Sequence, residues 1–358
     1  MSVLPSTLAG SSVLSRAHER AIGRWLAVVA AMIFAMIVIG ALTRLTESGL
    51  SMVEWRPVTG WLPPLSEAAW QAELARYAAS PQGRLVNQGM SLAEFKQIFW
   101  FEYFHRLWGR IIGLAFALPL AWFLVRRHVP RWLVPRLVML LLLGGLQGAI
   151  GWIMVASGLR DQPAVSHYKL AMHLTLAVAL YAYILWLVLT LLAPSRPEHH
   201  RRGDLGIALG ARALIGALFV VITWGAFVAG LRAGQVHTTF PTMSGYWLPP
   251  GLFDLSPVWL NFVETQAGTQ FAHRWLAAAL VLGVALFWWR ARRGDVSQPV
   301  RRATNMVAAM TALQFALGVA TILSGAQIAL ATLHQVGAVL LLSSLVLTLR
   351  RSVMTLSR

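Results

Sequence analysis

Stretches of about 20 apolar residues recur along the chain, and short polar or charged segments separate one stretch from the next. An α-helix of that length crosses the roughly 30 Å hydrocarbon core of a bilayer. The pattern therefore predicts an all-α integral membrane protein with eight transmembrane helices. We place them at residues 22–42, 106–125, 133–155, 170–192, 209–231, 273–290, 304–323 and 328–349.

Composition agrees with this class. The 358 residues are 57% hydrophobic and 12% charged, and soluble domains carry about twice that charged fraction. There is no cysteine, which excludes disulfides and thiolate metal ligands. The first span is too long for the core of a signal peptide and no small-residue cleavage site follows it, so we expect no cleaved signal. The first 15 residues are too short for a convincing mitochondrial transit peptide, which favours a bacterial inner membrane.

The net charge of +17 is unevenly distributed. The termini and the even-numbered connections hold 19 arginines against four acidic residues, whereas the opposite side holds 11 Lys and Arg against nine acids. Because basic loops stay on the cytoplasmic side, we expect both termini in the cytoplasm. The basic excess then contacts anionic lipid head groups, and nothing requires a nucleic-acid partner.

The first four spans resemble the last four. QGAIGWIMVASGL (147–159) matches QFALGVATILSG (314–325), and FEYFHRLWGR (101–110) matches TQFAHRWLAA (269–278). An even number of spans in each copy gives both copies the same orientation. We predict two pseudo-repeated four-helix bundles, residues 1–192 and 209–358, joined by a cytoplasmic linker at 193–208.

The first outer loop, residues 43–104, is the largest segment outside the membrane. Ser66–Arg76 predicts a short amphipathic helix that Ser66 caps. Ser91 and Glu94 form a capping-box pattern, which predicts a helix that runs directly into the second span.

Ten histidines fall into two groups. Six lie in termini or connections, where those on the cytoplasmic side are explained by solvent or head-group contact and the roles of the outer two stay open: His18, His128, His199, His200, His167 and His237. The other four lie within the first two turns of alternate spans, all near the outer face: His105, His173, His273 and His334. Ionisable residues inside a membrane are costly and mark functional sites.

Neutral imidazole is a good axial ligand for haem iron, and two facing helices of a bundle can each supply one. We therefore predict two haem sites, His105 with His173 in the first half and His273 with His334 in the second. Zinc and copper compete for such ligands. Without cysteine and with at most one carboxylate in each half, a closed tetrahedral zinc site is poorly supplied.

Charged residues accompany these histidines. Arginines near the outer surface could pair with haem propionates, with interfacial snorkelling as the alternative: Arg106, Arg110, Arg274, Arg44 and Arg232. Glu102 precedes His105 by three residues and shares its helix face. A carboxylate there could transfer protons or stabilise a developing positive charge, which Gln270 in the second copy cannot do. We therefore expect chemistry at the first haem and electron transfer at the second; the alternative is that Glu102 caps a helix or pairs with Arg106.

These motifs, in this order from about residue 20 to 350, resemble the haem A synthase family. The resemblance implies eight transmembrane helices in two halves and oxidation of the C8 methyl of haem o to the formyl of haem a, by two successive hydroxylations and loss of water. It implies that His273 and His334 ligate a haem b cofactor, that His105 and His173 hold the substrate haem, and that Glu102 is the catalytic carboxylate. The cysteine pair that some bacterial members carry in the outer loops is absent, so the chain resembles the proteobacterial and mitochondrial branch, and its electron donor stays open.

Further expectations follow from the resemblance. The haem sites lie toward the periplasm, and the partners are haem o synthase (protohaem farnesyltransferase) and cytochrome oxidase assembly factors. Two other classes compete with the enzyme. A di-haem b-type electron-transfer protein would use the same ligand pairs but usually holds its haems near opposite membrane faces. A transporter of parallel repeats would show broken helices with polar residues at the midplane, of which the sequence has few.

Overall fold

The computed structural model describes residues 7–56, 59–160, 163–193 and 202–353. Within them, eight helices are long and apolar enough to cross a membrane, in agreement with the sequence prediction. These are α1 (Thr7–Leu45), α4 (Leu92–Val125), α5 (Val134–Gly158), α6 (His167–Leu191), α7 (Arg202–Gly230), α9 (Gln266–Arg293), α10 (Gln298–Leu323) and α11 (Ile328–Ser352). Most of the predicted linker, residues 194–201 with His199 and His200, lies outside the described residues.

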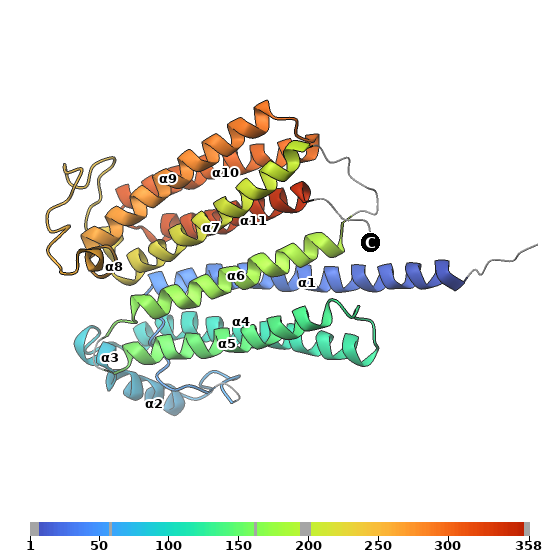
Figure 1. Ribbon diagram of the computed structural model, residues 1–358. Helices are drawn as coiled ribbons and strands as arrows, with labels where there is room; N and C mark the ends of the chain where they lie inside the picture. The colour runs from blue at the N-terminus through green and yellow to red at the C-terminus, as the bar shows by residue number, and fades with distance from the viewer. Residues whose placement is uncertain (1–6, 57–58, 161–162, 194–201, 354–358) are drawn as a thin grey trace, which may run out of the picture.

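Four helices form the centre of the bundle (Figure 1). Helix α6 packs against α1, α7 and α11, and α11 also packs against α1 and α7. The other helices flank this centre, α4 and α5 on the side of α1 and α6, and α9 and α10 on the side of α7 and α11. The tightest packing is apolar, with Leu26, Leu137, Leu341 and Leu345 fully buried. The outward faces of the flanking helices stay apolar and exposed, as expected for helices that contact lipid.

The two ends of the bundle differ. One end, which we call the loop end, carries the short helices α2 (Glu67–Ala78), α3 (Pro81–Leu85) and α8 (Asn261–Glu264), with the 3-10 turns η1 (Ala233–Gln235) and η2 (Val258–Leu260). The other end holds the α4–α5 and α9–α10 turns, the first turns of α1 and the last turns of α11 (Figure 1). We call it the terminus end.

Capping residues set the helix boundaries that the sequence predicted in the first outer loop. Ser66 caps α2 by accepting from the N–H of Ala69. Ser91 and Glu94 form the complete capping box at the start of α4, which continues without a break to Val125. Helix α4 is longer than its apolar span, because the capped polar turns at its start continue the helix beyond the apolar residues.

The predicted sidedness leads to a direct test. We expect alkaline phosphatase fused after residue 75, in α2 at the loop end, to be active in the periplasm. Green fluorescent protein fused after residue 294, between α9 and α10 at the terminus end, is expected to fluoresce in the cytoplasm, because arginines concentrate there. Activity at residue 294 with fluorescence at residue 75 would reverse the orientation.

Candidate haem sites

The second half brings its two predicted ligands together. His273 on α9 and His334 on α11 have ring centroids 6.5 Å apart, with ring planes at 88°. A metal lies about 2 Å from an imidazole nitrogen, so two imidazoles on opposite sides of one iron have centroids roughly 6 Å apart. The observed spacing fits a bis-histidine haem site. Two axial ligands suffice for haem; among the described residues, no group of three or more His, Asp or Glu side chains could hold a metal ion.

A glycine faces each histidine ring of this pair from the neighbouring helix. A β-carbon built at Gly318 on α10 would lie 2.9 Å from Cε1 of His334, and one at Gly225 on α7 would lie 3.2 Å from Cε1 of His273. A side chain at Gly318 would displace the ring. These glycines allow the imidazoles to lie close against the adjacent helix backbone.

The first half repeats this arrangement. His105 on α4 faces Gly40 on α1, and His173 on α6 faces Gly151 on α5, where an added β-carbon would lie 3.3 Å and 2.9 Å from the respective rings. In both halves, each predicted ligand therefore packs against a glycine of a neighbouring helix, and the pairing of His105 with His173 stays a prediction.

Two glutamines complete the pattern. Gln147 Nε2 lies 3.1 Å from His173 Nδ1 and donates to the His173 carbonyl at 3.0 Å. Gln314 makes the same pair of contacts with His334, at 3.1 and 2.9 Å. Gln147 precedes Gly151 by four residues, and Gln314 precedes Gly318 by four, so each glutamine lies on the same helix face as its glycine. The glutamine and the glycine of each Q-x-x-x-G stretch therefore both contact the histidine of the following helix.

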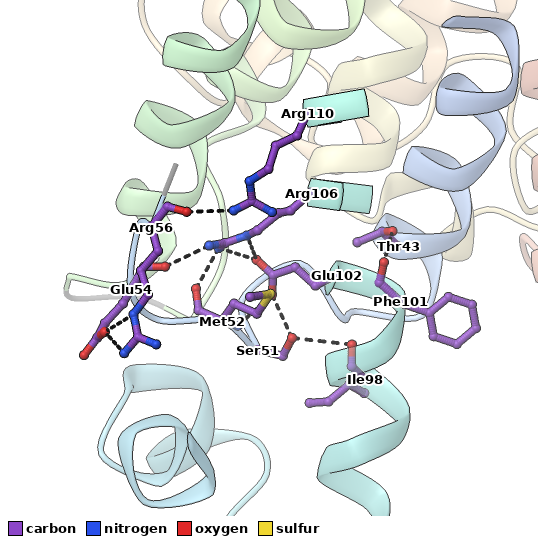
Figure 2. A network of polar contacts seen from close by, with 10 residues as sticks. All are labelled: Thr43, Ser51, Met52, Glu54, Arg56, Ile98, Phe101, Glu102, Arg106 and Arg110. Atoms are coloured by element: carbon purple, nitrogen blue, oxygen red, sulfur yellow. Dashed lines mark hydrogen bonds and ion pairs between the residues drawn. The ribbon is translucent and has the colours of Figure 1, made fainter. Parts of the chain in front are cut away.

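Glu102 lies at the centre of a buried network at the loop end (Figure 2). Its side chain is 3% exposed. One oxygen accepts from the Ser51 hydroxyl and the Met52 N–H, both at 2.7 Å, and the other accepts from Arg106 Nε at 3.0 Å and its terminal nitrogen at 2.5 Å. The ion pair with Arg106, one of the two alternatives that the sequence left open, is present. Four donors thus surround the carboxylate, two on each oxygen.

Arg106 also fixes the outer loop. Its terminal nitrogens donate to the carbonyls of Met52 at 2.7 Å and Glu54 at 2.8 Å. Arg110 donates to the Arg56 carbonyl at 2.7 Å and lies over the Trp61 ring. The guanidinium groups expected near haem propionates thus hold loop backbone, and their role toward propionates stays a prediction.

We call an arginine that holds carbonyls of the outer loop, together with the residue four positions before it, a clamp. The second half has such a clamp with Gln270 in place of the carboxylate. Arg274 donates to the carbonyls of His237 at 2.7 Å and Thr239 at 2.9 Å. Buried Gln270 donates to the His237 carbonyl at 3.0 Å. The residue type thus matches the loop: Glu102 receives hydrogen bonds from Ser51 and Met52, whereas Gln270 gives one to a carbonyl.

The remaining candidates have structural partners. Arg44 donates to the Ala229 carbonyl at the end of α7, at 2.6 Å, and Arg232 pairs with Glu47 at 2.8 Å, so both join the two halves. His167 lies 3.8 Å from Glu264 across the same boundary. His237 bonds Ser244 through Nδ1, and burial, followed by the positive charge of Arg274, lowers its pKa.

Sequence reasoning missed the glutamines and the glycines that surround the histidines. Both stretches were recognised as a repeat, and their shared Q-x-x-x-G spacing was the available signal. What the sequence did not show is which helix these residues face. Only the packing of α5 on α6 and of α10 on α11 brings them to His173 and His334.

Comparison with known proteins identifies the family of this chain. The cytochrome oxidase assembly protein family (COX15-CtaA) matches residues 23–346. Haem A synthase of Rhodospirillum centenum is 50% identical over 94% of this chain and 89% of its own length. That of Nitrosospira multiformis is 45% identical over 96% of both chains, and haem A synthase COX15 of Arabidopsis thaliana is 42% identical over 93% of this chain and 75% of its own. Because the family model covers most of the chain and these relatives are 42–50% identical over nearly its full length, the chain belongs to the haem A synthase family.

Proposed function

We propose that this protein is a haem A synthase, an oxidoreductase that oxidises the C8 methyl group of haem o to the formyl group of haem a for cytochrome oxidase. A first hydroxylation gives a hydroxymethyl group, a second gives a geminal diol, and loss of water leaves the formyl group. The observation that carries the proposal is the pair of duplicated histidine sites, of which only one has a carboxylate in its clamp.

The asymmetry between the clamps supports a division of roles. In our proposal, substrate haem o lies between His105 and His173, beside the Glu102 clamp. Haem b lies between His273 and His334, whose 6.5 Å ring spacing suits two axial ligands. Haem b supplies one-electron transfer when bound. The halves are in contact along α6, α7 and α11, so the two sites are neighbours within one bundle.

The contacts of Glu102 favour an electrostatic role over a proton shuttle. Both oxygens already accept two hydrogen bonds, and Arg106 balances the charge. A proton shuttle would first have to break one of these hydrogen bonds. We propose that Glu102 stabilises positive charge that develops at the substrate and keeps residues 51–54 closed over the site.

Cell context follows from the function. We propose that the protein lies in a bacterial inner membrane with both termini cytoplasmic and the loop end periplasmic. It would receive haem o from haem o synthase and deliver haem a to cytochrome oxidase assembly factors. The electron donor stays open.

Pigment extraction tests this function. When the purified protein is produced together with a source of haem o, we expect its extract to contain haem b with a mixture of haem o and haem a. The haems are separated by reversed-phase chromatography, with haem b alone from cells that lack haem o as the control. Haem b alone in the presence of haem o would contradict the enzyme and favour an electron-transfer protein.

A further inference from the structure

Each of the two glutamines beside the histidines has an amide oxygen that accepts no hydrogen bond from the described residues. In both Gln147 and Gln314 the amide nitrogen lies 3.1 Å from Nδ1 of the histidine, and for Gln147 it also lies 3.4 Å from His173 Nε2; the amide oxygen is buried. A buried acceptor without a donor costs about 1–3 kcal/mol. An unpaired oxygen beside an imidazole indicates that it receives a hydrogen bond in another state of the site.

The chemistry of a liganded imidazole identifies that state. When Nε2 binds iron, Nδ1 carries the hydrogen and needs an acceptor. The observed orientation of the amide offers Nδ1 a donor, which suits the opposite tautomer. A half-turn of the amide exchanges its oxygen and nitrogen, which are nearly equal in size. It gives up the hydrogen bond from the amide nitrogen to the histidine carbonyl, so it is favoured only when the new bond from Nδ1–H offsets that loss.

We propose that Gln147 and Gln314 are positioning residues that set the tautomer of one axial ligand at each haem. With iron at Nε2, the amide oxygen accepts the Nδ1–H of His173 or His334; without iron, the amide nitrogen donates to Nδ1 and to the histidine carbonyl. Gly151 and Gly318 let the rings pack closely against α5 and α10, the helices that carry the glutamines, so each amide stays beside its ring. This inference rests on the proposed haem sites.

Within the described residues, one histidine of each predicted pair has a glutamine contact. Each glutamine lies on the third membrane helix of its half, α5 or α10, and serves the histidine of the fourth, α6 or α11. No corresponding glutamine contact is observed within the described residues at His105 or His273, on α4 and α9. In our proposal, the glutamine would therefore set the donor strength of one of the two imidazoles in each pair.

The haem b site of the purified full-length protein offers a readout that is independent of turnover. Gln314→Glu presents a carboxylate to Nδ1–H, makes His334 a stronger donor and stabilises ferric haem, so the midpoint potential falls. Gln314→Leu removes the acceptor, so the potential rises and haem b binds about 10- to 100-fold more weakly. Both are measured by redox titration of the low-spin haem absorbance and by haem titration of the stripped protein.

Gln335 is a matched control. It is the next residue after His334, and its amide donates to the Ile37 carbonyl of α1 at 3.2 Å and not to a histidine ring. Gln335→Leu should leave the potential unchanged. Unchanged potential and affinity in both Gln314 variants, or an equal shift in Gln335→Leu, would overturn the positioning role. If the unmodified protein binds no haem b, the haem assignment itself falls, and this inference with it.

Discussion

Replacement of Glu102 by glutamine is expected to lower conversion of haem o to haem a by at least about 100-fold and to leave haem b bound. The four groups around this side chain are all donors: the Ser51 hydroxyl, the Met52 N–H and two nitrogens of Arg106. An amide nitrogen at either end meets a donor, and the charge that balances Arg106 is lost. Breaking a buried ion pair from one side costs about 3–5 kcal/mol of folding free energy, here concentrated in the outer loop.

The measurement is haem a formed per haem b in membranes that contain each variant. Glu54→Gln is the matched control, because Arg106 binds the Glu54 carbonyl while the Glu54 carboxylate is largely exposed and pairs with Arg56; we expect near-normal conversion. Limited proteolysis of the loop separates the two parts of the proposed role. Loss of conversion with a protected loop indicates electrostatics at the substrate, whereas a newly cleaved loop indicates closure. Normal conversion by Glu102→Gln would refute both.

Replacement of His334 by leucine is expected to remove the low-spin haem b spectrum completely. His334 and His273 form the pair with 6.5 Å between ring centroids, and leucine offers iron no ligand. Leucine at position 173, in the first half, should keep haem b and reduce conversion of haem o. These opposite results follow from the proposed division between the halves.

The low-spin haem b absorbance of each purified variant is measured in reduced-minus-oxidised spectra. His128→Leu is the control, since His128 stacks on His18 at the terminus end with centroids 3.9 Å apart and lies away from both pairs; its spectrum should equal that of the unmodified protein. A full haem b spectrum in His334→Leu would show that the second-half pairing is wrong. Loss of haem b in His173→Leu would reverse the assignment of the halves.

The number and order of membrane helices could be predicted from the sequence because they depend on local composition. Twenty apolar residues satisfy their own backbone as a helix in lipid, whatever surrounds them. The caps at Ser66 and Ser91 were equally local, since each side chain bonds an N–H within three residues. Helix ends were placed less well elsewhere: α1 begins at Thr7, 15 residues before the apolar span predicted to start at 22.

The candidate site was predictable as far as residue types repeat. Matching histidines on alternate helices pointed to shared pockets, and the exchange of Glu102 for Gln270 pointed to a difference between them. The partners of these side chains were not predictable. The role of Arg106 and Arg274 toward propionates stays a prediction, and their bonds to loop carbonyls were not foreseen, because these depend on where the loop returns to the helix.

Sequence alone determined the class of protein, its eight helices, the four histidines and the family, because hydrophobic length, charge placement and motif spacing are properties of neighbouring residues. The tertiary structure decided what each side chain contacts. Helix packing set the ring spacing of His273 and His334 and brought Gln314 to Nδ1, and the return of the outer loop brought two donors to Glu102 from about 50 residues away along the chain. Such contacts join residues on different helices, and their geometry follows from how whole helices pack, which no local pattern encodes.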